Sequence, residues 1–515
     1  MVSYKMLLAD RLSDSVKKYY GNGECIDFKE NSEGFFCDYS ISPLNPETFL
    51  KISRNIIASD IDCAYELSSF SGVYEDGNSN NRMLQRIYVL AFATAAELDE
   101  YKLAIAEAAK RDHKVLGNEL KLFSSSADIG QGLILWHPKG AMLRYVLESF
   151  GQKAHILNGY EWLYTPHIGK AELWKTSGHL DFYKDSMYSP IVIDSDEYYL
   201  KPMNCPFHIN IYNSDIHSYR ELPIKYAEYG TVYRYELSGT LSGLTRVRGF
   251  TQDDAHIICT PEQVEKEVEN ALKFSLYILR SFGLQRFQPY VSTRPKNKSI
   301  GDDKDWEMAT DVLKKAVISA GLEYKIDEGG GAFYGPKIDL KLFDSLNREW
   351  QCSTIQFDFN LPNRFNMFYM GKDGQQHTPY MVHRALFGSL ERFMALLIEH
   401  YKGDFPFWFS PIQFGIVPIK ESHNNYARLL SKKLREQGFH VKLNNDDDNM
   451  RNKIKRFQLE KTPYILIVGD REAANNTFSV RSRKDGELGV MDIEALCTYL
   501  APQIEQGIPK CIEDG

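Results

Sequence analysis

The stretch YRYELSGTLSGLTRVRGFTQDDAH, residues 233–256, decides the fold. Its two ends have the pattern of β-strands, and its Gly- and Ser-rich middle is typical of a connecting loop. Such a hairpin can direct charged side chains toward one ligand, and the planar fork of arginine suits a phosphate. An exposed hairpin with solvated arginines would have the same pattern. The charged side chains that this hairpin could direct in this way are Arg234, Glu236, Arg246 and Arg248.

Outward from the hairpin, residues 115–410 mix helical patterns with strand-like runs, which predicts an α+β domain built on an antiparallel sheet. Beyond residue 411, strands and helices alternate, and this predicts a separate α/β domain over 411–515 with a mostly parallel sheet. Residues 1–114 combine a small α+β region with an exposed connecting helix over 97–114. The chain is therefore expected to have three domains.

The composition is that of an ordinary folded protein, with 515 residues, a hydrophobic share of 43% and a formal net charge of −8. Any contact with nucleic acid must therefore come from local basic faces. The eight cysteines form no repeating CxxC pattern, which favours a reducing compartment. The first residues do not resemble a signal peptide, and no stretch reaches the ~18 apolar residues of a membrane span. We expect a soluble, cytoplasmic protein without a membrane partner.

A second segment, HRALFGSLERFMALLIEH at 383–400, has the spacing of a helix. Arg392 lies within an otherwise apolar pattern, and a buried arginine must be paired or hold an anion. Arg392 is therefore a candidate ligand for a polyphosphate, and a structural ion pair with Glu391 or another acid is the alternative. The small residues that would let a second backbone come close are Ala385, Gly388 and Ser389.

Three possible soft metal ligands occur far apart in the chain, at Cys205, His256 and His383. One cysteine and two histidines would make a zinc site with a fourth position left open, which is the catalytic rather than the structural pattern. The spacing alone does not establish this, because a buried cysteine or histidine is more often part of a core. A metal site and an ordinary core both remain open at this point.

Read in order, the motifs of the chain resemble the signatures of threonyl-tRNA synthetases, and the resemblance covers about residues 70–500. It implies a class II α+β catalytic domain and a C-terminal α/β anticodon-binding domain. GAMLRYVLESFGQKAHILNGYEWLYTP at 140–166 is similar to the dimer-forming motif 1, so a homodimer is implied. The motifs that carry the resemblance are KPMNCP at 201–206, YRYE followed by RVRGFTQDDAH, GAFYGPKID at 331–339, WQCSTIQFDF at 350–359 and HRALFGSLERF at 383–393.

The resemblance implies a ligase that uses ATP with Mg²⁺ to activate L-threonine and then charges tRNA(Thr). Catalysis would be mostly positioning, because fixed arginines and Mg²⁺ stabilise the charge that builds on the phosphoryl oxygens. Arg234 would hold the α-phosphate, and Glu236 the adenine amine. Arg246 and Arg392 would hold the outer phosphates, and Gln351 and Lys337 match residues near the adenylate.

Cys205, His256 and His383 match the zinc ligands of the family, which implies one Zn²⁺ per chain. An apolar pocket separates threonine from valine only about 100-fold, whereas a metal that must bind the amine and the hydroxyl rejects valine far better. The residues that match the threonine-binding positions are Asp254, Gln252, Tyr334 and Gln356. Without the resemblance, these four would be read as polar core residues.

For transfer to tRNA, His179 in TSGHLDFY matches the histidine suited to relay the proton of the terminal 2′-hydroxyl, although a solvated loop histidine is the alternative. In the C-terminal domain, Glu472 and Arg481 are expected to read anticodon bases. A solvated charged face would have a similar composition. Residues that could contact tRNA phosphates are Lys453, Lys455, Arg456, Arg481 and Arg483.

The chain departs from full-length relatives at its N-terminal end. Segments 31–41 and 71–88 look like the flanks of an editing domain, but ADRLSDSVKK at 9–18 stands where paired histidines are expected, and the Cys/His segment is absent. We expect no hydrolysis of seryl-tRNA, because serine differs from threonine by a methyl group worth only ~1–3 kcal/mol and its removal needs a dedicated site. A separate editing protein in trans is one expected partner. Phe207, where many relatives have glycine, is a second departure.

Two alternatives remain. The first is a catalytically inactive synthetase-like protein with an RNA-binding or regulatory role, because a fold can outlive its activity. The second is a class II synthetase specific for another amino acid, such as serine or proline. The intact phosphate-binding arginines argue against the first, and the Cys/His/His set together with Asp254 argues against the second.

Overall fold

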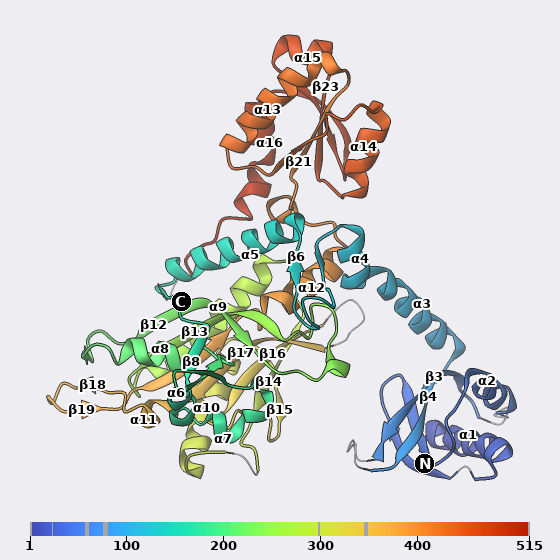
Figure 1. The fold of residues 1–515 in the computed structure, drawn as a ribbon, viewed down its shortest axis with the longest axis vertical. Coiled ribbons are helices and arrows are strands. Elements are labelled where there is room, and N and C mark those ends of the chain that lie inside the picture. Colours follow the sequence, from blue (N-terminus) through green and yellow to red (C-terminus); the bar gives the residue numbers. More distant parts are fainter. Residues whose placement is uncertain are drawn as a thin grey trace. The chain divides into compact units, whose positions relative to one another are not determined.

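The computed structural model describes residues 3–22, 24–56, 61–75, 81–296, 299–343 and 349–512. The chain forms two compact units, Met1–Ala109 and Lys110–Gly515 (Figure 1). Part of the predicted editing-like flank at 71–88, residues 76–80, lies outside the described residues. The prediction of three domains divided at 114 and 410 stays a prediction.

The first unit is a four-stranded antiparallel sheet in the order β1-β2-β4-β3, with two helices packed against it. Leu12 of the first helix, Cys37 and Ile87 are completely buried in its core, so the alternating residues of the central strands hold the helices in place. Ser3 caps the first helix, and Gly21 ends it in a left-handed conformation. The elements are α1 Tyr4–Tyr20, β1 Cys25–Glu30, β2 Gly34–Tyr39, α2 Pro46–Asn55, β3 Ala64–Tyr74 and β4 Met83–Phe92.

The predicted connecting helix over 97–114 is in fact two helices, α3 Ala95–Arg111 and α4 His113–Glu119. Asp112 leaves the helical conformation, and its Oδ1 accepts a hydrogen bond from the backbone N–H of Lys114 at 2.7 Å. This is the geometry of an N-cap. The apolar spacing that predicted a single helix does not reveal this N-cap, at which the second helix, α4, begins with His113.

The largest sheet of the second unit has eight strands in the order β15-β14-β16-β17-β20-β13-β12-β7. All its central pairs are antiparallel, and only the two outermost pairs, β14–β15 and β12–β7, are parallel. This confirms the predicted antiparallel sheet. The strands are β7 Glu161–Trp162, β12 Ile224–Tyr233, β13 Gly249–Cys259, β14 Phe287–Ser292, β15 Lys325–Asp327, β16 Lys337–Phe343, β17 Glu349–Asp358 and β20 Tyr380–Ala385.

Helices α9 Val264–Ser281 and α10 Asp303–Ser319 pack against this sheet (Figure 1). Leu272 and Leu279 of α9 are fully buried in one core with Phe357 of β17. Burial of such side chains contributes about 1.5–3 kcal/mol each. The face that these helices cover is thereby closed to ligands, and a site must lie elsewhere on the sheet.

The prediction of one helix over 383–400 is wrong. His383 to Ala385 end strand β20, and helix α12 runs only over Leu390–Tyr401. Gly388 has φ +71°, and a Cβ there would lie 2.7 Å from the carbonyl oxygen of Cys352, so glycine is required at this turn. Ser389 then accepts a hydrogen bond from the N–H of Arg392 at 3.1 Å and starts the helix. Pairing of β20 with β13 and β17 overrides the helical spacing.

The remaining helices and strands of residues 115–410 include the helix α5, in the segment similar to motif 1, and the helix α8, which begins at Cys205. Their bounds are β5 Phe123–Ser124, β6 Leu135–Trp136, α5 Pro138–Leu157, β8 Ile168–Lys170, α6 Ala171–Thr176, α7 His179–Phe182, β9 Ile191–Ile193, β10 Asp196–Leu200, α8 Cys205–Tyr212, β11 His217–Ser218, α11 Leu361–Arg364, β18 Tyr369–Met370 and β19 Gln376–His377.

The C-terminal part is a five-stranded sheet in the order β22-β21-β23-β24-β25. Two of its pairs are parallel and two are antiparallel, so the prediction of a mostly parallel sheet is wrong for the half formed by β24 and β25. The elements are β21 Phe414–Pro418, α13 Asn424–Glu436, β22 Val441–Leu443, α14 Met450–Leu459, β23 Tyr464–Val468, α15 Asp470–Asn475, β24 Phe478–Ser482, β25 Gly486–Met491 and α16 Ile493–Glu505.

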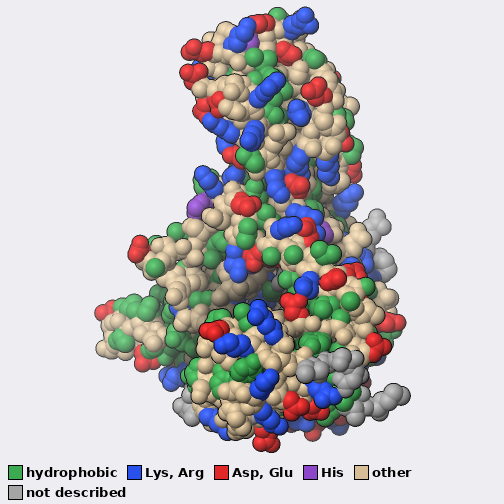
Figure 2. Space-filling model, turned by 90° about the vertical axis from the view of Figure 1, so that its right-hand side faces the viewer, with side chains coloured by type: hydrophobic (Ala, Val, Ile, Leu, Met, Phe, Trp, Pro, Cys, Tyr) green, Lys and Arg blue, Asp and Glu red, His purple; other side chains and the backbone are tan. Residues whose placement is uncertain are grey.

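Among the described residues, no helix combines the length and the apolar character needed to cross a membrane. Lys and Arg side chains are interspersed with Asp and Glu over the face shown in Figure 2. This agrees with the net charge of −8 and with the expectation that any nucleic-acid contact is local.

Candidate functional site: a polar cavity over the central sheet

A cavity of about 610 Å³ lies over strands β13, β17 and β20. Alternate residues of a strand share one face, and here that face is polar. His383 of β20 lies between His256 of β13 and Gln356 of β17 in the sheet register. The residues of these strands whose side chains line the cavity include Gln252, Asp254, His256, Gln351, Thr354, Gln356 and His383.

The hairpin of β12 and β13 supplies the charged wall of the cavity. Arg234, Glu236 and Arg246 line it, as the sequence predicted. Arg246 forms an ion pair with Glu236 at 2.9 Å, so the two side chains hold each other at the rim. Arg248 does not line the cavity, because its Nε donates instead to the carbonyl oxygen of Glu236 at 2.9 Å. The expectation that all four charged residues point to one ligand is wrong for Arg248.

Arg392 enters the cavity from the first turn of α12. Its Nε donates to the carbonyl oxygen of Thr245 at 3.1 Å, and its Nη1 to that of Gln351 at 3.3 Å. Burial lowers the pKa of Arg392. The alternative of an ion pair with Glu391 is wrong, because that carboxylate binds Arg144 and the N–H of Thr251.

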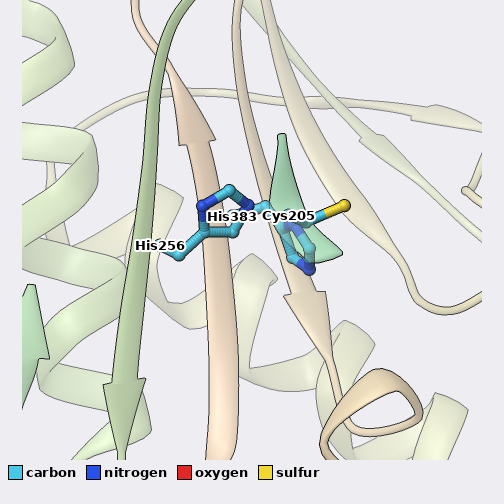
Figure 3. Close-up of side chains that lie close together, drawn as sticks. All are labelled: Cys205, His256 and His383. Carbon is cyan, nitrogen blue, oxygen red and sulfur yellow. The ribbon is translucent and has the colours of Figure 1, made fainter. Parts of the chain in front are cut away.

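Cys205, His256 and His383 line the cavity, and their side chains lie close together (Figure 3). One ligand atom of each lies within 4.8 Å of the others, and all three residues are buried. Cys205 opens helix α8, while the two histidines are neighbours across β13 and β20, with ring centroids 4.6 Å apart. Burial raises the pKa of the Cys205 thiol and lowers that of His256, so both groups are neutral where no cation is bound.

Outer hydrogen bonds orient both histidines. His383 Nε2 lies 2.8 Å from Asp358 Oδ2, and Asp358 is completely buried. The carboxylate can only accept, so Nε2 carries the proton and Nδ1 presents its lone pair toward the cavity. Partners of this kind fix the tautomer of metal-binding histidines. The sequence reading missed Asp358, although WQCSTIQFDF contains it.

A buried chain of three groups orients His256. Glu228 Oε1 lies 3.3 Å from His208 Nε2, and His208 Nδ1 lies 2.8 Å from His256 Nδ1. Because the carboxylate accepts the Nε2 proton, His208 Nδ1 must accept in turn from His256 Nδ1–H. The lone pair of His256 Nε2 is then directed to the other two ligands. His208 lies two residues beyond the motif KPMNCP and Glu228 lies in β12, and neither carried a spacing signal.

The four residues predicted to hold threonine all line the cavity. The Oδ2 of Asp254 accepts from Asn204 Nδ2 at 2.9 Å, and burial raises the pKa of Asp254. The Tyr334 hydroxyl donates to the Oε1 of Gln356. The structure therefore brings Gln252, Asp254, Tyr334 and Gln356 together around the three soft ligands.

Two residues predicted near the adenylate differ in position. Gln351 lines the cavity, with its Nε2 donating to Asp339 Oδ1 at 2.7 Å. Lys337 does not line it, because its Nζ pairs with Asp339 Oδ2 at 2.7 Å. Asp339 is buried, so this ion pair holds the side chain of Lys337 along strand β16, to which both residues belong.

His179 does not line the cavity either. It is completely buried behind Met203, with its Nε2 3.0 Å from that sulfur and its Nδ1 2.7 Å from the Ser177 hydroxyl. Burial lowers the pKa of His179 to about 3. The ring is therefore neutral near pH 7, and reaching a tRNA hydroxyl would require Met203 to move. The alternative of a solvated loop histidine is wrong.

The predicted anticodon residues lie on the C-terminal sheet and helices. Lys455 is exposed on α14 and Arg481 is half-buried on β24. Glu472 accepts from the N–H of Gly469 at 3.0 Å and from Ser479 at 2.9 Å, which stabilises the start of α15. Three other candidates are engaged within the protein: Lys453 is buried on the carbonyl of Pro418, Arg456 pairs with Asp446 and Asp448, and Arg483 donates to the carbonyls of Lys461 and Phe405.

Two family models match the chain. The tRNA synthetase class II core domain (G, H, P, S and T) matches residues 188–401, and the anticodon binding domain matches residues 413–503. The threonine–tRNA ligase of Aquifex aeolicus is 52% identical over 442 residues, which are 86% of this chain and 69% of that protein. The threonine–tRNA ligase of Borreliella afzelii is 52% identical over 431 residues, 84% of this chain and 74% of that protein. The chain belongs to the threonine–tRNA ligase family.

Solved structures agree with this assignment. The RNA binding domain of threonyl-tRNA synthetase from Cryptosporidium parvum is 38% identical, with a TM-score of 0.74, and the match covers 78% of this chain and 100% of that one. A putative threonyl-tRNA synthetase from Aeropyrum pernix is 30% identical, with a TM-score of 0.68, covering 78% and 99%. The predicted family and the predicted class II fold with an anticodon-binding domain are confirmed. Because the chain belongs to this family, its cavity over β13, β17 and β20 is the candidate active site.

Proposed function

We propose that this chain is an active threonine–tRNA ligase, which activates L-threonine with ATP to threonyl-adenylate, releasing pyrophosphate, and then transfers the threonyl group to the 3′ end of tRNA(Thr). The observation that carries the proposal is the cavity that the three candidate phosphate-binding arginines, Arg234, Arg246 and Arg392, share with the Cys/His/His cluster. Membership of the family supports the same activity. An inactive paralogue would have no reason to keep both sets of side chains around one space.

In the first step, a carboxylate oxygen of threonine attacks the α-phosphorus of ATP, the bond to the bridging oxygen breaks and pyrophosphate leaves with its Mg²⁺. Arg234 holds the α-phosphate, while Arg246 and Arg392 hold the outer phosphates. Each guanidinium presents a planar fork of donors to phosphate oxygens. Because backbone carbonyls already orient Arg392, little reorganisation is needed as charge develops.

The adenine ring and the adenylate are held by a second set of side chains in this proposal. Glu236 holds the adenine amine once Arg246 leaves their present ion pair for the phosphates. Gln351 lies beside the adenylate in the cavity. Lys337 contributes through Asp339, since that pair also fixes Gln351.

The cluster of Cys205, His256 and His383 fits one Zn²⁺ per chain. The donors are soft, buried and convergent, and outer partners direct the lone pairs of both histidines. When bound, Zn²⁺ would supply a Lewis acid with an open position for the amine and hydroxyl of threonine. Asp254, Gln252, Tyr334 and Gln356 would orient the amino acid around it.

In the second step, the terminal ribose hydroxyl of tRNA attacks the activated carbonyl, its proton is lost and AMP leaves. We assign proton relay to His179, which is neutral near pH 7 because burial lowers its pKa to about 3. The relay requires displacement of Met203 when tRNA binds. Arg481, Glu472 and Lys455 would contact the anticodon.

Further properties belong to the same proposal. A homodimer is supported by β7, which lies at the end of the central sheet, and by exposed apolar side chains on the same segment, such as Ile156 and Tyr164. A cytoplasmic location is supported by the eight cysteines, all of which lie among the described residues as free thiols. An editing protein in trans would remove serine from tRNA(Thr), since serine retains the groups that a metal recognises.

The proposed function is tested by pyrophosphate exchange with threonine, serine, valine or proline, followed by charging of tRNA(Thr). We expect exchange with threonine, weaker exchange with serine, and none above background with valine or proline. No exchange with any amino acid would favour the inactive paralogue, and a preference for serine or proline would favour another specificity. Zinc content is measured on the same protein and after Cys205→Ala, which we expect to remove the metal and threonine-dependent turnover.

A further inference from the structure

One buried histidine lies outside the residues matched by the class II core domain and touches the loop that carries Arg246. His113 is the first residue of α4 and is only 3% exposed. Its Nε2 accepts a hydrogen bond from the backbone N–H of Leu244 at 3.1 Å. Leu244 belongs to the loop between β12 and β13, and it stands two residues before Arg246.

The loop backbone is seated directly on this ring. Gly243 has φ +48°, and a Cβ at this position would come within 2.2 Å of His113 Nε2. Leu244 is completely buried in the core. A residue larger than glycine would push the loop away from the ring, so the sequence Gly243–Leu244 matches the position of His113.

Glu399 fixes the orientation of His113. Its Oε1 lies 2.8 Å from His113 Nδ1 and accepts the backbone N–H of His113 at 3.2 Å. Since a carboxylate only accepts, the ring proton sits on Nδ1 and the lone pair of Nε2 faces Leu244. Glu399 therefore sets the tautomer that the loop requires.

The same helix holds the next loop residue from the other side. Arg392, like Glu399, belongs to α12, and its Nε donates to the carbonyl oxygen of Thr245 at 3.1 Å. Leu244 and Thr245 are thus fixed through their N–H and C=O, respectively. Arg246 follows at once, with its side chain about half exposed at the rim of the cavity. The anchored backbone determines where this guanidinium can reach.

Asp112, His113 and Glu399 also bring three possible metal-ligand atoms within 4.8 Å. Both ring nitrogens of His113 are already used, one by Glu399 and the other by Leu244. A cation would have to displace one of these bonds. The hydrogen bonds alone account for the closeness of the three side chains.

We propose that His113, oriented by Glu399, is a positioning residue that anchors the ATP-binding loop of β12 and β13 in the place from which Arg246 reaches the phosphates. The inference rests on the proposed function, and it assigns a role in ATP binding to a residue that touches neither ATP nor threonine. Loss of the anchor should weaken ATP binding more than threonine binding. Three of the four candidate threonine-binding residues, Gln252, Asp254 and Gln356, lie on strands β13 and β17 and not on this loop.

The test compares two substitutions in the full-length protein by threonine-dependent pyrophosphate exchange. His113→Phe fills the volume without an acceptor, whereas the side-chain oxygen of His113→Gln can replace Nε2 as acceptor. We expect His113→Phe to raise the KM for ATP about tenfold, the effect of one buried hydrogen bond. The KM for threonine should stay within about twofold, and His113→Gln should recover most of the ATP affinity. Glu399→Leu should act like His113→Phe, and the double variant should be no worse than either.

His440→Phe is the matched control. His440 is a half-buried histidine of the C-terminal part whose Nδ1 donates to the backbone carbonyl oxygen of Ser410 at 3.3 Å. Pyrophosphate exchange needs no tRNA, so both KM values should be unchanged in this variant. Equal effects of His113→Phe and His113→Gln, or equal increases in both KM values, would overturn the proposal and leave a purely structural role.

A second readout does not depend on turnover. Amide hydrogen exchange of residues 241–247 should accelerate in His113→Phe and remain near the wild-type rate in His113→Gln. If the unmodified protein lacks threonine-dependent pyrophosphate exchange, the proposed function fails. Amide hydrogen exchange still tests whether His113 anchors the loop. An unchanged rate of amide hydrogen exchange in the loop of His113→Phe would refute the anchoring role of His113.

Discussion

His208 and Glu228 lie behind the candidate metal ligands and determine which nitrogen of His256 faces the cavity. Both are buried, and Glu228 is further held by the hydroxyl of Thr165 at 2.7 Å and by Lys201 Nζ at 3.6 Å. Removing one member leaves the others buried without a partner, which is more costly than never having made the bond. At the scale of the residue, the function of the site therefore depends on side chains that touch no substrate.

Glu228→Gln tests this dependence. The amide can donate to His208, so the hydrogen bonds from residue 228 through His208 to His256 can run in the opposite direction. His256 Nε2 would then carry a proton instead of a lone pair. We expect zinc affinity to fall about 10- to 100-fold, measured as zinc per chain in competition with a chelator. Glu221→Gln is the control, because Glu221 pairs with His217 at the surface. Wild-type zinc affinity in Glu228→Gln would contradict the proposed orientation.

The burial of His179 makes a prediction about pH. Its pKa is about 3 in the folded protein and near 6.5 when unfolded. Between these values the unfolded chain binds a proton that the folded chain does not, so stability falls as pH decreases from 6.5 toward 3, by about 1.4 kcal/mol per pH unit. His179→Gln should reduce the slope of unfolding free energy against pH, measured with urea between pH 4 and 7. An unchanged slope would show that His179 is protonated in the folded state.

At the scale of the element, the turn between β20 and α12 joins the metal candidate to the phosphate wall. Asp253 accepts the N–H groups of Leu386 at 2.8 Å and Phe387 at 2.9 Å, which ties the turn to β13. Gly388 then reverses the chain, and Ser389 caps the helix that carries Arg392. One strand, four residues and one helix start thus place His383 and Arg392 on the same cavity.

Gly388→Ala is expected to damage both ends of this connection. The new methyl group would strain a backbone at φ +71° and lie 2.7 Å from the carbonyl of Cys352. We expect a loss of about 1–3 kcal/mol in unfolding free energy and an increased KM for ATP. Gly374→Ala is the matched control, with φ +72° and open space around the added methyl. Equal losses in the two variants would mean that contact with Cys352 has no effect.

At the scale of the whole molecule, activation and tRNA recognition are assigned to different parts of the chain. The cavity is built from residues 183–392, whereas the anticodon binding domain matches 413–503. Side chains on the second segment should therefore affect charging without affecting exchange.

Arg481→Ala tests this separation. We expect kcat/KM for tRNA(Thr) to fall about tenfold or more, since one base contact is worth about 1–3 kcal/mol, while pyrophosphate exchange is unchanged. Lys484→Ala, an exposed neighbour, should change neither measurement. A parallel fall in exchange and charging after Arg481→Ala would contradict the division.

Several features of the fold follow from local sequence, because they depend on residues a few positions apart. The strand–loop–strand pattern at 233–256 and the alternation of strand and helix beyond residue 411 are of this kind. The antiparallel pairing of β24 with β25 was also readable, since the three-residue connection 483–485 is too short for a parallel crossover. The prediction of a mostly parallel sheet overlooked this length.

The sequence by itself determined the chemical identity of the site: motifs in order, phosphate-binding arginines and three soft ligands. Only the tertiary structure decided which of them meet. It placed His383 on a strand instead of a helix, turned Arg248 and Lys337 away from the cavity and buried His179 and Lys453. The physical reason is that hydrogen-bond register and burial arise between residues more than a hundred positions apart, as for His256 with His383 or His113 with Leu244. No local periodicity records such pairs.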